Sequence, residues 1–285
     1  DTIYRREVFG VPTGGWTNTD LDGSVLHSTT ELDCAAVNGM THLLVKANNP
    51  SGAALMAIGT DDTFDAFERV YTDTVFSSLP SIAPHNGGLS TYSMSELHGG
   101  SLTFSTVSES TSEETTAEGD ITSALDHVFV EASSTSNYHV VGGFNAGGDA
   151  LILRTLAMGY GGNGWSAVVL PPPSGTTYAY SPTLCALTPP ALGEFNEDGI
   201  HAVAVADGAL WYVELGSYPQ TDVDYTWLPL IDGVEAASAP DCVKTKIVST
   251  TVIYLNVVVI NTDGETVLIS GNAADGFSAT NLGRY

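Results

Sequence analysis

One recurring unit dominates the chain, and its best copy occupies residues 207–230. This copy opens with the turn Asp207-Gly208, continues into a short apolar strand (209–215), and ends, after a polar loop, with an aromatic-led strand (225–230). Copies recur at intervals of roughly 45 to 60 residues, a period typical of propellers and solenoids. The other five copies are residues 2–21, 54–71, 101–125, 150–170 and 265–282. In the copy at 101–125, residues 119–125 are the expected second strand.

A second, looser module lies between successive copies. It consists of an inner strand, often introduced by a Ser-Pro or Ser-x-Pro signal, followed by a strongly apolar strand. Proline is tolerated at the first residue of a strand because no ladder N–H is needed there. The signals are at 81–84, 181–182 and 238–240, and the apolar strands are expected at 42–46, 89–94, 138–144, 201–206 and 252–260.

Four short strands per unit, separated by turn residues, match the blade of a β-propeller. We therefore predict an all-β fold, with residues 1–285 forming a single propeller domain of four-stranded blades. A pair of β-sandwiches or an irregular β-solenoid is the alternative. The acidic, Ser/Thr-rich segment at about 107–119 is expected to be a solvated loop.

The number of blades is less constrained, because six copies of the unit enclose only five of the intervening modules. A closed ring needs whole blades. Either five blades close with the end segments pairing across the seam, or a sixth blade is half present. We favour five blades, with six as the next alternative.

The charge of the chain limits its partners. The chain has 8 Lys and Arg residues and 33 Asp and Glu residues, which gives a net charge of −25. Nothing in such a chain could neutralise a row of nucleic-acid phosphates or an anionic membrane surface. No apolar run approaches the roughly 20 residues that span a bilayer, so membrane insertion is not expected. Calcium, a neutral glycan or a basic extracellular protein would all be compatible partners.

Acidic, glycine-containing turns precede several strands. They include the run Asp20-Leu21-Asp22-Gly23 and the run 194–199 (EFNEDG), which leads into the apolar strand 200–206 and the Leu210-Trp211 strand. This rhythm resembles the integrin-type FG-GAP repeat propellers, and also the lectin propellers built on similar units, although no unit matches the full motif.

The resemblance implies calcium binding by oxygen ligands at alternate loop positions. Glu194, Asn196 and Asp198 fall on the first, third and fifth ligand positions, and Asp20 and Asp22 match in the first unit. The chain departs from the pattern further along, where Ile200 or His201 replaces the expected acid. The alternative is that these acid-glycine runs only make tight turns.

Bulky aromatic residues occupy one position of the repeat: Trp16, Phe67, Trp165, Trp227 and Phe277. Such residues are expected to pack between blades, where each buries a large apolar area. The resemblance to lectin propellers implies that some of them also stack on sugars. Tyr160, in a glycine-rich loop, is a candidate for a contact surface. The candidate ligand-binding residues are Trp16, Tyr160, Trp165 and Trp227.

The three cysteines fall on the expected inner strands. Their odd number excludes a fully paired framework. Cys185 and Cys242 belong to successive units and could pair, but buried thiols are favoured for all three, including Cys34. No spacing among the cysteines and histidines indicates a metal site.

No catalytic or phosphate-binding motif is present. The sequence therefore favours a binding module over an enzyme: extracellular or surface-associated, glycan-binding or adhesive, and stabilised by calcium. One alternative is a structural subunit of a filament, appendage or capsid decoration that assembles through its terminal blade. The other is a propeller-type glycoside hydrolase with a carboxylate pair at one mouth of the channel.

Overall fold

The chain folds into successive antiparallel sheets in a computed structural model. From residue 121 onward the structure describes residues 121–133, 136–145, 147–159, 165–187, 199–246 and 252–284, and before residue 121 it describes strands alone. Among the described strands, five sheets have four strands each, and within every one of these sheets the strands are adjacent in chain order. This arrangement confirms the prediction of an all-β fold made of four-stranded units.

The sheets are named here in chain order. The first sheet contains β3 (Leu32–Val37), β4 (Met40–Lys46), β5 (Ala54–Thr60) and β6 (Thr63–Glu68). The second contains β7 (Ser81–Pro84), β8 (Tyr92–His98), β9 (Ser101–Val107) and β10 (Glu114–Ala117). The third contains β11 (Ile121–Ser133), β12 (Ser136–Asn145), β13 (Leu151–Gly159) and β14 (Trp165–Leu170).

The remaining sheets follow the same order. The fourth contains β15 (Thr183–Cys185), β16 (Ile200–Ala206), β17 (Ala209–Gly216) and β18 (Leu228–Pro229). The fifth contains β19 (Asp241–Lys246), β20 (Ile253–Ile260), β21 (Thr266–Asn272) and β22 (Gly276–Gly283). A two-stranded half-sheet is formed by β1 (Thr2–Arg5) and β2 (Thr17–Asp20).

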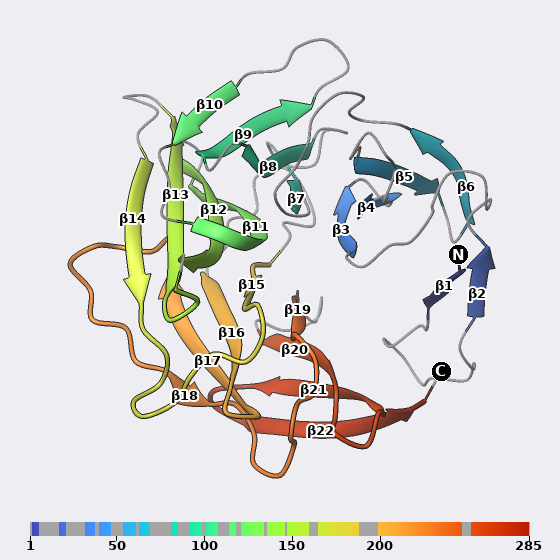
Figure 1. The fold of residues 1–285 in the computed structure, drawn as a ribbon, viewed down its shortest axis with the longest axis vertical. Helices are drawn as coiled ribbons and strands as arrows, with labels where there is room; N and C mark the ends of the chain where they lie inside the picture. The colour runs from blue at the N-terminus through green and yellow to red at the C-terminus, as the bar shows by residue number, and fades with distance from the viewer. Residues whose placement is uncertain are drawn as a thin grey trace.

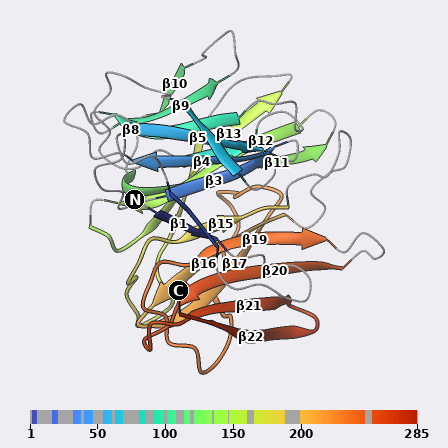
Figure 2. The same cartoon turned by 90° about the vertical axis from the view of Figure 1, so that its right-hand side faces the viewer.

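The sheets stand around a common centre (Figure 1), with the first strand of each, β3, β7, β11, β15 and β19, lying innermost. Successive inner strands contact one another: β3 with β7, β7 with β11, β11 with β15, and β15 with β19. The half-sheet lies between the first and the fifth sheets, as both views show (Figures 1 and 2). We call this place the seam.

Each copy of the sequence repeat supplies the third and fourth strands of a sheet, and the intervening modules supply the first and second strands. One assignment was wrong. Residues 121–133 are β11, the innermost strand of the third sheet, and not the fourth strand of the second. That place belongs to β10, Glu114–Ala117, inside the segment expected to be a loop. An edge strand of sequence ETTA carries no apolar pattern that would reveal it.

The core lies between the faces of neighbouring sheets. Between the fourth and fifth sheets, one cluster joins Val203, Val205 and Leu210 to Val257 and Ile269, all fully buried. A second cluster joins the third sheet to the fourth. Burying one such side chain stabilises the fold by about 1.5–3 kcal/mol. The central strand β16 is buried at every position and apolar at all but His201, because its two faces serve both clusters.

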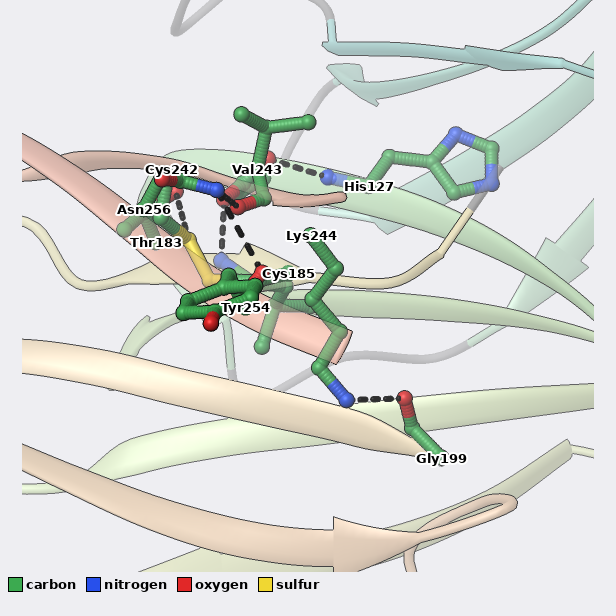
Figure 3. Close-up of a disulfide and its surroundings, with 11 residues drawn as sticks. His127, Thr183, Cys185, Gly199, Cys242, Val243, Lys244, Tyr254 and Asn256 are labelled. Atoms are coloured by element: carbon green, nitrogen blue, oxygen red, sulfur yellow. Dashed lines mark hydrogen bonds between the residues drawn. A yellow bond between two sulfur atoms is a disulfide. The ribbon is translucent and has the colours of Figure 1, made fainter. Parts of the chain in front are cut away.

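A disulfide links the inner strands of the fourth and fifth sheets (Figure 3). It joins Cys185 of β15 to Cys242 of β19, with a Cα–Cα distance of 5.6 Å, so the preference for buried thiols was wrong for these two residues. The bond closes a loop of 57 residues. In the loop-entropy account, such a crosslink stabilises the fold by about 4 kcal/mol. The side chain of Cys34 lies outside the described residues.

Candidate functional site

A pocket of about 350 Å³ opens where the fourth sheet meets the fifth. This volume falls at the lower end of the range for small-molecule sites. The fourth sheet contributes one residue from β16 and one from β17. The fifth sheet contributes a residue of β19, the start of β20, and the β21–β22 hairpin. The lining residues are His201, Glu214, Lys244, Val252, Ile253, Leu255, Asn272, Ala273, Ala274, Asp275 and Phe277.

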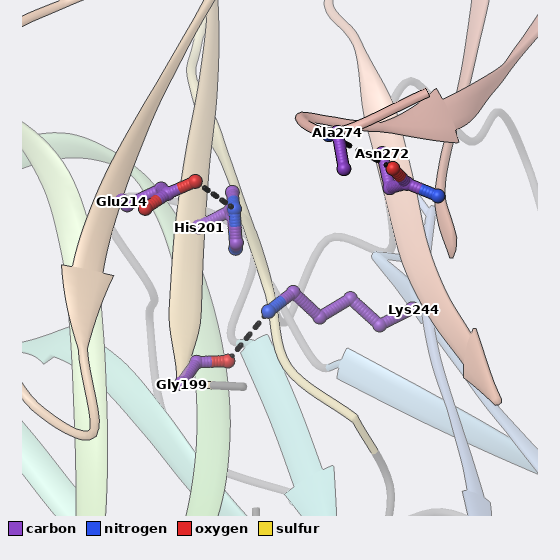
Figure 4. A network of polar contacts seen from close by, with 6 residues as sticks. All are labelled: Gly199, His201, Glu214, Lys244, Asn272 and Ala274. Atoms are coloured by element: carbon purple, nitrogen blue, oxygen red, sulfur yellow. Dashed lines mark hydrogen bonds and ion pairs between the residues drawn. The ribbon is translucent and has the colours of Figure 1, made fainter. Parts of the chain in front are cut away.

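The fourth sheet presents a polar pair to the pocket. His201 and Glu214 are opposite each other in the β16–β17 ladder, and their side chains approach with Nε2 and Oε1 3.6 Å apart (Figure 4). His201 is buried, whereas the Glu214 side chain is 59% exposed. A contact between charged or polar side chains that is this exposed to solvent contributes little to stability. The pair therefore presents one exposed acceptor to a ligand, the Glu214 carboxylate.

Lys244 crosses from the fifth sheet to the fourth. Its side chain is buried, and its Nζ donates a hydrogen bond of 2.8 Å to the carbonyl oxygen of Gly199, just before β16 (Figures 3 and 4). Gly199 adopts a φ of 62°, and a Cβ there would overlap the carbonyl oxygen of Gly216. Only glycine fits this position, so the lysine finds its acceptor at a fixed place.

A tight turn forms the far rim of the pocket. Asn272 Oδ1 accepts hydrogen bonds from the backbone N–H groups of Ala274 (2.9 Å) and Asp275 (2.8 Å). Asn272 Nδ2 donates to Asp275 Oδ2 at 2.9 Å. Asparagine side chains commonly stabilise turns in this way. The turn holds an amide and a carboxylate at the mouth of the pocket, with Phe277 next to them.

Three rings connect the polar pair to the rim. His201 stacks on Tyr212, with centroids 5.9 Å apart and planes at 19°, and Tyr212 meets Phe277 edge-on at 5.4 Å. Loss of hydration raises the pKa of Tyr212, and the nearby Glu214 carboxylate adds to the rise. Tyr212 therefore keeps its proton and packs as a neutral ring between His201 and Phe277.

A second group of polar residues lies on the inner strands. Loss of hydration raises the pKa of Asp126 on β11 to about 6, and the nearby Asp241 carboxyl on β19 adds to the rise. Hydrogen bonds from Leu184, Thr183 and His127 oppose it. The pKa of Asp241 is also raised, first by loss of hydration and against a hydrogen bond from the N–H of Cys242. Two carboxyls that are hard to ionise thus stand near each other on inner strands.

The described tryptophans proposed as ligand contacts lie at sheet boundaries. Trp227 packs against the core between the third and fourth sheets; its Nε1 donates 2.9 Å to the carbonyl oxygen of Pro171, and its ring meets Tyr178 edge-on at 6.0 Å. Trp165 packs against the small cluster of the third sheet. Both arrangements agree with the packing role expected for this repeat position. Trp16 and Tyr160 lie outside the described residues.

The proposed calcium ligands are almost entirely outside the described part of the chain. Asp22, Glu194, Asn196 and Asp198 all lie there, and of Asp20 only the backbone, at the end of β2, is described. Among the residues that the structure does describe, no group of three His, Cys, Asp or Glu side chains is arranged to hold a metal ion. Within the same ranges, no helix has the length and apolarity needed to cross a bilayer.

Sequence reasoning missed most of the pocket. Phe277 was identified, but as a packing residue, and His201 only as a departure from a metal loop. Lys244, Glu214, Asn272 and Asp275 carried no motif, because they come from three strands and a turn and meet only after two sheets pack. The available signal was local: Glu214 interrupts an apolar strand, and Asn272 to Gly276 has the composition of a tight turn.

Comparison with known proteins reveals similarity in fold only. No family model matches the chain, and no curated protein matches it. Among solved structures, the six-bladed β-propeller lectin of Aleuria aurantia is 9% identical, with a TM-score of 0.59 over 93% of this chain and 83% of the lectin. A mutant of that lectin in complex with α-methyl-L-fucoside gives a TM-score of 0.58 at 7% identity, over 94% and 83% of the two chains.

An enzyme shares the same architecture. The GH93 α-L-arabinofuranosidase of Fusarium graminearum, solved with arabinobiose, is 12% identical, with a TM-score of 0.57 over 98% of this chain and 85% of the enzyme. Likeness at this level of identity shows the fold and not the activity. The chain therefore has the β-propeller fold that both a fucose lectin and a glycosidase use.

Proposed function

We propose that this chain is a glycan-binding module and that the pocket between the fourth and fifth sheets is a binding site. The observation that carries the proposal is the composition of this pocket. It combines an apolar and aromatic wall with hydrogen-bonding groups of both kinds, converging from two sheets.

Sugar rings need this combination. Their hydroxyl groups donate and accept hydrogen bonds, while their C–H faces and methyl groups are apolar. Asn272 offers an amide, Glu214 and Asp275 offer acceptors, and Phe277 with its aliphatic neighbours offers an apolar surface. A pocket with convergent polar groups on apolar walls is the usual form of a small-molecule site. The fucoside complex of a similar propeller makes a fucoside the first ligand to test.

The test is calorimetric titration with α-methyl-L-fucoside, followed by a glycan array. Glu214→Gln should weaken binding about tenfold or more, because an anionic acceptor is replaced by a neutral amide. Glu235→Gln, at an exposed glutamate in the connection between the fourth and fifth sheets, is the matched control and should bind normally. The proposal is wrong if no glycan class binds, or if the two variants behave alike.

We also propose the finer properties expected from the sequence. The module is extracellular or surface-associated, it binds glycans or an extracellular protein in an adhesive role, and calcium stabilises its acidic loops. Treatment with a chelator should then lower the melting temperature, and calcium should restore it. A chain that melts identically in both conditions has no stabilising calcium.

A glycoside hydrolase is the second candidate, and the pair Asp126 and Asp241 favours it. A carboxyl group with a pKa of about 6 can hold a proton near neutral pH and act as a general acid. 4-Nitrophenyl glycosides, including the α-L-arabinofuranoside, provide the assay. If the chain hydrolyses one of these substrates and Asp126→Asn abolishes the activity, the chain is a glycoside hydrolase and the assignment as a binding module is wrong.

A further inference from the structure

A side-chain link joins the inner strand of the third sheet to that of the fourth. The Asp126 carboxylate on β11 accepts a hydrogen bond from the backbone N–H of Leu184 on β15. It also accepts one from the N–H of His127 at 2.8 Å, and one from the Thr183 side chain. Asp126 thus ties its own sheet to the next one around the ring.

The same residue type recurs at the same register of other inner strands. In three sheets, an aspartate of the inner strand pairs with the second strand at an equivalent position. Its partner on the second strand lies two residues before the last residue of that strand that pairs with the third strand. These pairs are Asp33 with Leu44, Asp126 with Gly142, and Asp241 with Val258. Asp241 is therefore the counterpart of Asp126 in the fifth sheet.

Asp241 points away from the fourth sheet. Its neighbour Cys242 bonds to Cys185 of the fourth sheet, and successive side chains of a strand point to opposite sides. Asp241 and Val243 consequently face the seam. The Asp241 residue as a whole is exposed, although enough protein surrounds its carboxyl group to raise its pKa. Within the described part of the chain, this carboxyl accepts a hydrogen bond only from the N–H of Cys242. It has the position of Asp126 without a counterpart of Leu184.

The fifth sheet also leaves apolar side chains uncovered on this side. Val243 is 42% exposed, and Val258 and Leu268, in register with Asp241, are only half-buried. The corresponding face of the fourth sheet, which the fifth sheet covers, is closed: Val203 and Leu210 are 0% exposed. The seam face of the fifth sheet (Asp241, Val243, Val258 and Leu268) therefore has the chemistry of an interface with another sheet.

The half-sheet stands next to this face. By its place in the sequence repeat, β1 corresponds to a third strand and β2 to a fourth. In the five four-stranded sheets, the inner edge of the third strand pairs with the second strand. No strand among those described pairs with the second edge of β1. Relative to the other sheets, two inner strands are thus not found beside β1 among the described strands.

We propose that the inner edge of β1 and the seam face of the fifth sheet together bind a two-stranded β-hairpin, which completes a sixth blade. The hairpin is an inner strand followed by an apolar strand. Its inner strand donates a backbone N–H to Asp241, and its apolar strand pairs with β1 and covers Val258 and Leu268. Strand addition of this kind is an established mode of peptide recognition.

A second copy of the chain does not fit this surface as well. Two copies paired edge to edge through β1 would satisfy that strand only. Such pairing brings no inner strand to Asp241 and covers none of the apolar side chains of the fifth sheet. The occupant is therefore a hairpin of the inner type and not another half-sheet.

The direct test uses a synthetic peptide of residues 237–261, the β19–β20 module of this chain, with Cys242→Ala. It should bind one to one and protect the amides of Thr2–Arg5 from hydrogen exchange. Asp241→Ala in the chain, with the peptide unchanged, should weaken binding about tenfold. Asp232→Asn, a substitution at an exposed control position of the chain, should leave binding unchanged. N-methylation of the peptide at its position 242, whose side chain faces the preceding sheet as that of Leu184 does, should weaken binding to a similar extent.

Since an isolated apolar hairpin can aggregate, the second arm fuses the same module after Tyr285 through a flexible linker. The fusion should melt at a higher temperature than the parent chain, and Asp241→Ala should reduce that gain. The proposal is overturned if the peptide fails to bind at about 1 mM and the fusion gives no gain. It is equally overturned if binding leaves Thr2–Arg5 unprotected, or if the chain dimerises through those residues instead.

Discussion

Asp126 makes the stability of the fold depend on pH. Its pKa is about 6 in the folded chain and 3.8 ordinarily, so between these values the folded state binds more protons than the unfolded state. The free energy of unfolding therefore falls as pH rises from about 4 to about 6, by at most about 3 kcal/mol. Urea titrations at pH 4 and pH 7 should reveal a smaller decrease for Asp126→Asn than for the parent chain. Equal decreases would contradict the raised pKa.

Gly199 is the residue whose backbone positions the acceptor of Lys244. Gly199→Ala should destabilise the fold by about 2 kcal/mol or more, because it adds a steric overlap with Gly216 to the strain of a positive φ. Gly208→Ala is the matched control: its φ is 80°, but its Cβ would meet nothing within 4 Å, so only the backbone strain remains. Similar losses in chemical denaturation would show that the overlap is not the cause.

At the scale of a single element, β19 is held by a disulfide, by Lys244, and by a bridge to Leu187. The double variant Cys185→Ser, Cys242→Ser should lose about 4 kcal/mol of stability, and glycan affinity with it, because Lys244 lies on the same strand. Cys34→Ser is the control for changing a thiol elsewhere. A double variant as stable as this control would mean that the hydrogen bonds and apolar contacts suffice.

How well the elements could be predicted depended on their burial. Strands such as β16 and β20 face the core on one or both sides, and their apolar runs revealed them in the sequence. Edge strands have no such pattern: β10 is polar, and β18 is two residues long where six were expected. The pocket could not be predicted from the sequence, because a cross-strand pair such as His201 and Glu214 depends on strand register, which only the folded sheet defines.

At the scale of the whole molecule, the net charge of −25 opposes compaction. Raising NaCl from about 10 mM to about 500 mM shortens the screening length from about 30 Å to a few ångströms, so it should raise the melting temperature. Differential scanning fluorimetry measures this directly, with sucrose of equal osmolality as the control for solute exclusion. A melting temperature insensitive to salt would mean that the acids are neutralised locally.

The hydrogen bond from Lys244 to Gly199 has a consequence for energetics. Because its donor and acceptor belong to different sheets, the pocket exists only while those sheets are docked. A ligand that binds the docked state alone stabilises it by RT ln(1 + [L]/Kd), which is about 2.7 kcal/mol at a ligand concentration of one hundred times Kd. Occupancy and sheet docking are thus thermodynamically linked, and the sugar would act as a reversible brace between the fourth sheet and the fifth.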